Sequence, residues 1–478
     1  MARKWWTLGA VVAGVFMLVL DITIVNVALP AIGRDFRSPL ADLQWVLDAY
    51  ALALAAGLLT GGSLADLWGR RRLYAAGTAA FTVCSLLCGL STGPLFLSIA
   101  RAGQGIGGAV VWATSLALLS DAFRGRDRGI AFGIYGAVLG LAVAVGPLLG
   151  GVLTSGLSWR WIFWVNIPVG VAVVVVTLTR LRESNNPGAP RPDWAGFGIF
   201  TAALVLVVYG LINAAGGWGQ PKVYATLAAG AALLAVFPFA EAAKQHPMLD
   251  LSLFRKPTFN GGLVAAVGLN ASLYSLFTYL VLYVQQQLGY SPEQTGVRFL
   301  ALTGAMFVAS TVAGRLTNAV PARWMISGGF VLISAGVLMM AWLTVSSGWL
   351  HLLPGMIVAG AGGGLVTVPL ASTAVGVVHV SKAGMASGIN ATARQVGLAA
   401  GIAVLGAVLA TRTRGAASPR AGFVDGLNEI LLIGAIVAFA AAVLSAALIR
   451  QRDFVPPPTA PSGPQAGQAV PEGTTQPG

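Results

Sequence analysis

The sequence predicts an all-α polytopic membrane protein, and three observations lead to that fold class. Of the 478 residues, 56% are apolar and only 9% are charged, and the mean hydropathy is +0.79, a composition typical of chains with many transmembrane helices. Apolar runs long enough to cross a bilayer follow one another along most of the chain. The basic residues behind the net charge of +13 are scattered in the loops between these runs, so we interpret them as topology signals and expect no nucleic-acid partner.

Each apolar run is predicted to form one transmembrane helix, because about 20 residues at a rise of about 1.5 Å each span the hydrocarbon layer. Fourteen such runs occupy residues 5–29, 43–64, 73–91, 95–120, 129–154, 161–179, 194–214, 222–241, 259–285, 294–314, 324–345, 350–373, 386–410 and 428–449. The first run follows two basic residues, as in a signal peptide, but it is long and lacks a small-residue cleavage site, so we expect a retained helix.

The loop charges predict the orientation of these helices. When the N-terminus is placed in the cytoplasm, most loop Lys and Arg residues fall on that side, including Arg70, Arg71 and Arg72 after the second run. Cytoplasmic loops carry such an excess of basic residues. An even number of helices returns the chain to the same side, so both termini are predicted to be cytoplasmic.

An internal repeat predicts how the helices are grouped. GSLADLWGRRRLYAAG at 62–77 overlays GRLTNAVPARWMISGG at 314–329, and GIGG at 105–108 overlays GAGG at 360–363. A duplicated unit of six helices gives two parallel repeats about an axis along the membrane normal, as in two-bundle transporters. The predicted organisation is an N-terminal six-helix bundle at 1–180, a linker with two extra helices at 181–258, a C-terminal six-helix bundle at 259–452 and a disordered cytoplasmic tail at 453–478.

A carboxylate stands inside the first apolar run. Asp21 lies in LDITIVNVALP, at membrane depth, where a charge costs about 3 kcal/mol on insertion scales. We therefore expect Asp21 to face protein or water and to have a function.

Four motifs in order resemble one transporter family. The loop after the second run carries Gly62, Leu64, Ala65, Asp66, Gly69, Arg70, Arg71 and Leu73, with Leu67 in place of a usual basic residue. The fourth run carries Arg101, Gln104, Gly105, Gly107 and Gly108, and the fifth carries Gly136, Gly140, Gly146, Pro147, Gly150 and Gly151. Together with LDITIVNVALP, these residues resemble the fourteen-helix drug:H+ antiporters of the major facilitator superfamily over about residues 5–450.

The resemblance implies a fold of two six-helix bundles plus two inserted helices, a bacterial plasma membrane location and a monomer that exchanges a small-molecule substrate for protons. It implies roles for two motifs. Asp66, with Gly62, Gly69, Arg70 and Arg71, is expected to form a cytoplasmic latch, the alternative being an ordinary solvated loop. In the second copy Asn318 replaces this acid, so the two halves are expected to contribute unequally.

The antiporter motif of the fifth run consists of Gly140, Gly146, Pro147, Gly150 and Gly151. Small residues permit close helix approach, and a proline permits a local bend. Packing alone and gating against the C-terminal half are both consistent with this pattern.

Proton coupling is assigned to Asp21, Arg101 and Asp48. A buried guanidinium needs an acceptor, and we expect Asp21 to be the neighbour of Arg101, directly or through water; the alternative is that Arg101 reaches the interface. Asp48 in WVLDAY is either an interfacial residue or part of proton entry or substrate attraction.

The substrate cavity is expected between the halves near the midplane. Its candidate lining residues are Asn26, Gln104, Trp112, Tyr135, Asn270, Tyr274, Phe277 and Tyr279. Arg394, the charge well inside the C-terminal half, is a candidate cytoplasmic gate or an interfacial residue. Because the acids lie mainly in the N-terminal half, lipophilic substrates that are neutral or monocationic are predicted.

No residue pattern supports an enzyme. There is no Cys/His metal-ligand spacing and no GxxxxGK[ST] loop, so no metal, no cofactor and no ATP hydrolysis are expected. The predicted mechanism is competition, in which substrate in the cavity favours proton loss from Asp21. The alternatives are an exporter of an endogenous lipid or metabolite, a metabolite:H+ symporter and a non-transporting scaffold.

Overall fold

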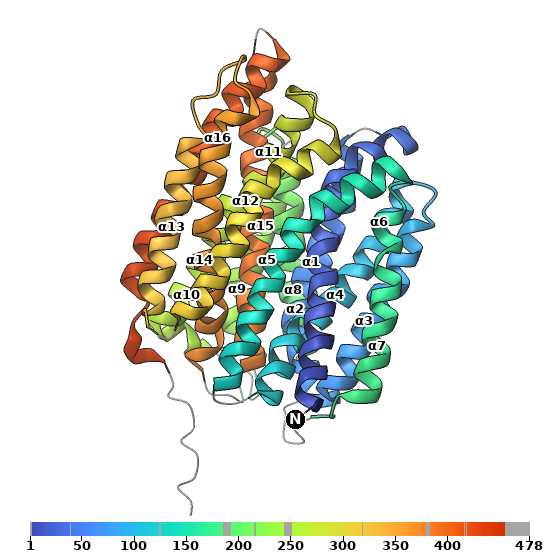
Figure 1. The fold of residues 1–478 in the computed structure, drawn as a ribbon, viewed down its shortest axis with the longest axis vertical. Helices are drawn as coiled ribbons and strands as arrows, with labels where there is room; N and C mark the ends of the chain where they lie inside the picture. Colours follow the sequence, from blue (N-terminus) through green and yellow to red (C-terminus); the bar gives the residue numbers. More distant parts are fainter. Residues whose placement is uncertain are drawn as a thin grey trace, which may run out of the picture.

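The computed structural model describes residues 2–38, 40–123, 126–184, 193–214, 217–242, 251–317, 319–378, 383–414, 416 and 418–454, and these residues form helices and connecting turns without a strand. The long helices run side by side along one direction (Figure 1). The α-helices are α1 (Ala2–Phe36), α2 (Leu40–Trp68), α3 (Arg70–Gly89), α4 (Pro94–Ala122), α5 (Arg126–Gly156), α6 (Trp161–Trp164), α7 (Asn166–Arg180), α8 (Trp194–Ala214), α9 (Pro221–Ala242), α10 (Pro257–Leu269), α11 (Ser275–Leu282), α12 (Pro292–Leu316), α13 (Ala322–Met339), α14 (Leu353–Gly376), α15 (Ala383–Arg414) and α16 (Pro419–Leu448). Two π-helices, η2 (Asn270–Tyr274) and η3 (Tyr283–Gln287), continue α10 and α11.

Thirteen helices in the described part of the chain are long and apolar enough to span a membrane. Among these, α6 and α7 count as one span, and α10 to η3 count as another. The remaining predicted span is α2, a helix of 29 residues with a shorter apolar stretch at Trp45–Leu58. The helices thus follow the fourteen predicted runs, and the all-α membrane fold class is confirmed.

The helices gather into two groups (Figure 1). The elements α1 to α7 pack among themselves, and α10 to α16 do the same. The groups meet where α5 packs on α12 and α2 packs on α15, while α8 and α9 pair with each other and α8 contacts α2 and α15. The domain boundaries drawn from the sequence stay a prediction. Asp453, placed in the tail by that prediction, accepts hydrogen bonds from the Thr258 hydroxyl at 2.6 Å and the Thr258 N–H at 3.3 Å.

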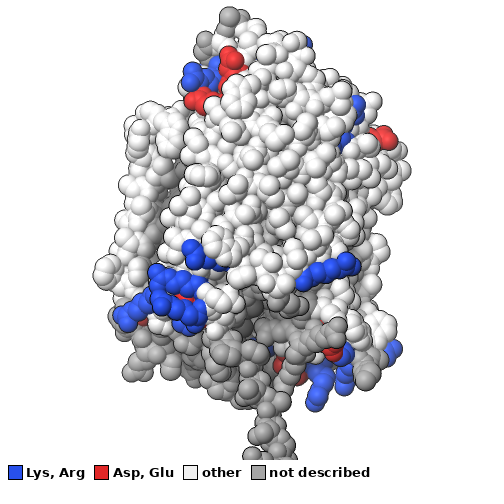
Figure 2. Space-filling model, turned by 60° about the vertical axis from the view of Figure 1, so that its left-hand side comes forward, with Lys and Arg blue, Asp and Glu red and all other residues white. Residues whose placement is uncertain are grey.

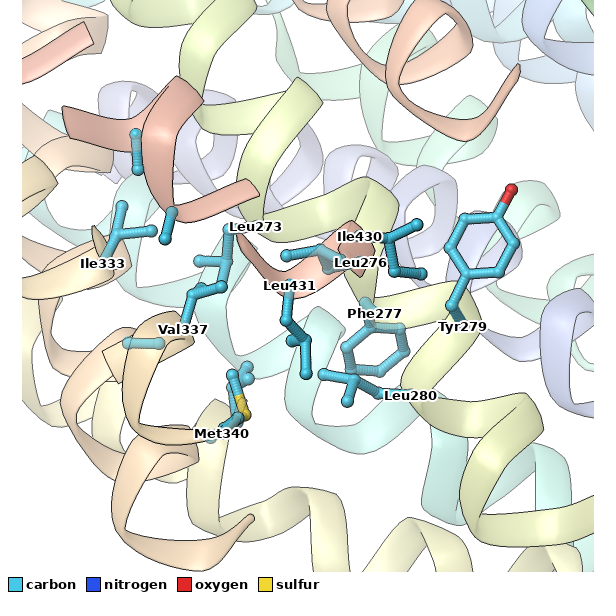
Figure 3. Close-up of a cluster of buried hydrophobic side chains, with 14 of the residues drawn as sticks. Leu273, Leu276, Phe277, Tyr279, Leu280, Ile333, Val337, Met340, Ile430 and Leu431 are labelled. Atoms are coloured by element: carbon cyan, nitrogen blue, oxygen red, sulfur yellow. The ribbon is translucent and has the colours of Figure 1, made fainter. Parts of the chain in front are cut away.

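The C-terminal group has an apolar core around η2 and α11 (Figure 3). Leu273, Leu276 and Leu280 are buried there, and the same core contains residues of α13 and α16. Tyr279 stands at the edge of the labelled cluster with its hydroxyl pointing away from it. The π-helical turns of this segment change the direction of its side chains relative to a regular α-helix, and such turns occur frequently at functional sites.

The outer surface suits a lipid environment. Large apolar side chains such as Ile99, Phe239 and Ile436 are exposed. Figure 2 shows a broad band without Lys, Arg, Asp or Glu across one face, with charged side chains gathered toward its two ends. This pattern matches a hydrocarbon layer bounded by water on both sides.

Candidate functional site: a buried carboxylate cluster and a central cavity

The Asp21 carboxylate lies at the centre of a fully buried polar cluster. Asp21 is 0% exposed and Arg101 is 1% exposed. Nη1 of Arg101 donates to Oδ2 of Asp21 at 2.5 Å, while the amide nitrogens of Gln104 and Asn166 donate to Oδ1 at 2.9 and 3.0 Å. The direct ion pair between Asp21 and Arg101 that the sequence predicted is therefore present, with two further donors on the same carboxylate.

The guanidinium of Arg101 is held on several sides. Its Nε donates to the Val46 carbonyl at 3.1 Å, and Nη1 also donates to the Gln104 side-chain oxygen at 2.8 Å. The Tyr50 ring lies 4.1 Å from the guanidinium carbon, within cation–π range. Arg101 therefore does not reach an aqueous interface, and the snorkelling alternative is wrong for this conformation.

Two residues of the cluster were missed by the sequence analysis. Asn166 begins α7, and one residue separates it from the short helix α6. Ser85 accepts from the amide nitrogens of Gln104 and Asn166 at 3.2 and 3.1 Å. Ser85 in turn donates to the Phe163 carbonyl at 2.8 Å. The available signal for Asn166 was an amide two residues before Pro168 inside an apolar run, whereas Ser85 had no signal that separates it from packing serines. Networks of this kind rigidify a core when every member is satisfied.

Asp48 lies apart from this cluster. It is partly exposed on α2, and no hydrogen bond joins it to another described residue. It lies within electrostatic reach of Tyr279 on α11, in the opposite group of helices. The Tyr279 hydroxyl donates to the Ile402 carbonyl of α15.

A central cavity of about 120 Å³ lies between the two groups of helices. Its described lining residues are Val19, Ile22, Thr23, Asn26, Leu58, Trp112, Leu139, Val143, Asn270, Tyr274, Phe277, Thr278, Thr367, Ala391, Arg394, Gln395, Leu398 and Ile402. Five of the predicted cavity residues are among them. Tyr135 instead lines a smaller void of about 20 Å³, which shares Trp112, Leu139, Ala391 and Arg394 with the cavity.

Two predicted cavity residues lie elsewhere. Gln104 belongs to the buried cluster around Asp21, because it projects from a different side of α4 than Trp112 eight residues later. Tyr279 is absent from the described lining and packs with its hydroxyl on α15.

Asp21 does not line the cavity either. Its α1 neighbours Ile22, Thr23 and Asn26 do, while the Asp21 carboxylate contacts α4 and α7. Substrate and proton therefore have separate sites in this geometry, and the predicted competition between them stays a prediction. α1 separates the two, carrying the acid on one side and cavity residues on the other.

The glycine motif of α5 has two faces. A Cβ on Gly150 would lie 2.9 Å from Cγ1 of Ile24, and one on Gly146 would overlap the Thr23 side chain, so these positions fit against α1. A Cβ on Gly140 would lie 3.5 Å from Cα of Phe307 on α12.

The backbone around Pro147, inside α5, is also close to α12. A Cβ on Gly296 of α12 would lie 2.8 Å from Cα of Leu148 and 3.0 Å from the Pro147 carbonyl carbon. Gly151 is buried in the same helix. Small residues thus let α5 approach both the helix that carries Asp21 and the opposite group of helices.

The loop between α2 and α3 is fastened by a residue that the sequence analysis did not select. Gly69 has a φ of +97°, a conformation that favours glycine. Beyond it, the backbone N–H groups of Arg71 and Arg72 donate to the two carboxylate oxygens of Glu183 at 3.1 and 3.3 Å. Glu183 thereby caps the start of α3.

The predicted latch residues lie around this cap. The Arg70 N–H donates to the Ser184 carbonyl at 3.0 Å, and the Arg71 side chain donates to the Leu178 carbonyl at 2.5 Å. The surroundings of Gly62, the side chain of Asp66 and the whole of Asn318 in the second copy lie outside what the structure describes.

Arg394 faces the cavity from α15. Its Nε donates to Oδ1 of Asn390 at 3.1 Å, and no other hydrogen bond joins its guanidinium to a described residue. It lines both the cavity and the smaller void, and it lies within electrostatic reach of Tyr135 and Tyr274. The structure thus places it between the two groups of helices and not at a lipid interface.

Two helical groups around a central cavity, with charged groups buried at membrane depth, define a membrane transporter of small molecules. Residues 11–402 match the model of the Major Facilitator Superfamily, and the chain belongs to that superfamily.

Two of its relatives are named for resistance. The multidrug resistance protein Stp of Mycobacterium tuberculosis is 37% identical over 84% of this chain and 75% of its own length. The puromycin resistance protein pur8 of Streptomyces alboniger is 37% identical over 94% of this chain and 92% of its own length. The human organic anion transporter MFSD10 has the same fold, with a TM-score of 0.66 at 14% identity over 93% of this chain and all of that one. The protein is therefore a transporter and not an enzyme.

Proposed function

We propose that this protein exports small lipophilic molecules in exchange for protons by alternating access. It works as a monomer in the bacterial plasma membrane, with both termini in the cytoplasm. The observation that carries the proposal is the buried Asp21–Arg101 pair on one side of α1, with the central cavity on the other side. The resistance names of the relatives support the outward direction.

Coupling runs through α1 in this proposal. In the conformation described here Asp21 is shielded from water by its partners, so a proton reaches it only after the ion pair opens. A protonated Asp21 no longer attracts Arg101 as an ion, which favours a different arrangement of α1 against α4. Because α1 also lines the cavity, substrate binding and protonation bias the same helix.

Two further elements have proposed roles. α5 contacts α1 through Gly146 and Gly150 and α12 through Gly140, so a shift of α1 is passed to the opposite helices through α5. The loop of Gly69, Arg70 and Arg71, which Glu183 holds, is proposed to form the cytoplasmic latch together with Asp66. Asp48 remains a proposed site of proton entry.

A proteoliposome experiment tests this function. A preformed pH gradient is monitored by a lumenal pH dye while 9-anthracenemethanol is added, with Asp21→Asn beside the wild type. We expect the wild type to discharge the gradient and Asp21→Asn to lose the coupled flux. Asp35→Asn is the matched control, because Asp35 lies on the same helix in an exposed pair with Arg160 at 2.9 Å. Coupled flux retained in Asp21→Asn would refute the role of Asp21, and lumenal acidification on substrate addition would indicate a symporter.

A further inference from the structure

The described lining of the central cavity contains a positive charge and no negative one. Arg394 is the charged residue among its described lining residues. The Asp21 carboxylate is turned away and fully paired, and Asp48 is not part of the described lining. A ligand in this cavity therefore meets a guanidinium that no carboxylate among the described residues neutralises.

The Arg394 guanidinium is held in place, but only part of its hydrogen-bonding capacity is used within the described residues. One bond, from Nε to the Asn390 oxygen one helical turn earlier, fixes the side chain along α15. The Nη1 and Nη2 groups make no hydrogen bond to a described residue, although the side chain lies between the cavity and the adjoining void. A guanidinium has five N–H donors and binds carboxylate-like groups in a bidentate way.

The other lining groups suit the aromatic part of a ligand. Trp112, Tyr274 and Phe277 supply rings. The amide nitrogens of Asn26 and Asn270 donate to carbonyls of their own helices at 3.0 and 2.9 Å, which leaves their amide oxygens to accept from ligand hydroxyl groups. Neutral amide oxygens do not replace a counter-ion for an ammonium group.

From this arrangement we propose that the cavity selects aromatic, lipophilic compounds that carry one acidic group, with Arg394 as the residue that binds the anion. The inference rests on the proposed export function and replaces the neutral or monocationic substrate class predicted from the sequence with a monoanionic one. A cation would enter beside a fixed like charge, which disfavours binding. The cavity volume of about 120 Å³ is below that of drug-sized sites, so the site widens when it opens toward a substrate.

Equilibrium binding of three matched probes tests the proposal. The probes are 9-anthracenecarboxylate, its neutral methyl ester and 9-anthracenemethylammonium, followed by fluorescence anisotropy with the full-length protein in detergent. We expect the carboxylate to bind about tenfold or more tighter than the ammonium probe, with the ester between them. In Arg394→Gln we expect the carboxylate to lose about tenfold while the ester changes by less than about threefold, and Arg394→Lys should retain part of the preference.

The control variant is Arg412→Gln, which removes an arginine from the same helix at an exposed pair with Glu429 and should leave all three affinities unchanged. Equal wild-type binding of the carboxylate and ammonium probes would overturn the proposal, and so would unchanged carboxylate binding in Arg394→Gln. Should that variant not fold, the wild-type comparison decides. Because equilibrium binding needs no proton gradient, lost proton coupling with an intact anion preference overturns only the proposed function.

Discussion

The two halves of the molecule hold their buried arginines in opposite ways. In the N-terminal half, Arg101 is enclosed, paired with Asp21 and bonded to Gln104 and a backbone carbonyl. In the C-terminal half, the Arg394 side chain has one hydrogen bond within the described residues, to Asn390, and faces the cavity. A satisfied buried ion pair suits a switch, because opening it costs free energy that another event must supply. A partly satisfied guanidinium suits a binding group.

The duplication sharpens this contrast. The position equivalent to Arg101 at the offset of 255 is Met356, which is 2% exposed in the apolar core of the C-terminal half. The residue at this position thus belongs to a charged network in α4 and to a hydrophobic core in the equivalent helix α14. The two copies therefore have different interiors, which is the basis for our proposal that proton handling belongs to the N-terminal half.

The largest effect is expected when Arg101 is replaced by methionine, the residue at the equivalent position 356 of the C-terminal half. Arg101→Met leaves the Asp21 carboxylate buried without its cation, which costs about 3–5 kcal/mol when one partner of a buried pair is removed. We expect a lower unfolding temperature in detergent and no proton-coupled transport.

The double variant Asp21→Asn with Arg101→Met separates these two effects. It removes both charges, so we expect most of the stability to return while proton coupling stays absent. If Arg101→Met alone unfolds like the wild type, the pair is not the buried charge network described here.

A pair of asparagine variants compares the two environments at closer range. Asn166→Ala removes one donor from the fully buried Asp21 carboxylate, and we expect a loss of about 1–3 kcal/mol in stability together with altered proton coupling. Asn390→Ala removes the acceptor of the Arg394 Nε beside the cavity, where a smaller loss of stability and a change in carboxylate-probe affinity are expected. Thermal unfolding and anisotropy measured on both variants check the contrast; identical behaviour of the two would contradict it.

Features whose absence or exposure would cost much free energy could be predicted from the sequence. Helices follow from the length of apolar runs, and a charge such as Asp21 or Arg101 in such a run demands a partner. Neutral polar residues carry no comparable cost, so Asn166 and Ser85 were not found.

The cavity was predicted only in part, because lining depends on the rotation of each helix and not on residue type. Gln104 and Trp112 share α4, yet only Trp112 faces the cavity. Glu183 was missed for another reason. Its partners, the N–H groups at the start of α3, are more than 100 residues away in the chain, and spacing alone does not predict which distant carboxylate caps a helix.

The smallest effect is expected for a carboxylate contact at the start of a helix, which occurs in both halves. A carboxylate beyond the last α-helix of each half bonds the start of another helix. Glu183 follows α7 and caps α3, and Asp453 follows α16 and bonds Thr258 at the start of α10. The hydrogen bonds from Thr258 hold the pKa of Asp453 below its ordinary value of 3.8. Because the pKa is lower in the folded state, Asp453 stabilises the protein above the unfolded-state pKa, and this contribution is lost as the pH falls through the folded-state pKa.

Asp453→Asn should therefore lower the unfolding temperature slightly at neutral pH and have less effect near pH 3. Thermal unfolding at both pH values measures the difference, with Glu183→Gln as the matched variant of the other half. We expect Glu183→Gln to have the larger effect at neutral pH, because Glu183 accepts from two backbone N–H groups in a loop that requires the positive φ of Gly69, whereas Asp453 accepts from one residue near solvent. An equal decrease in unfolding temperature in the two variants would contradict this expectation. It would indicate that the Glu183 cap stabilises the protein no more than the contact between Asp453 and Thr258 does.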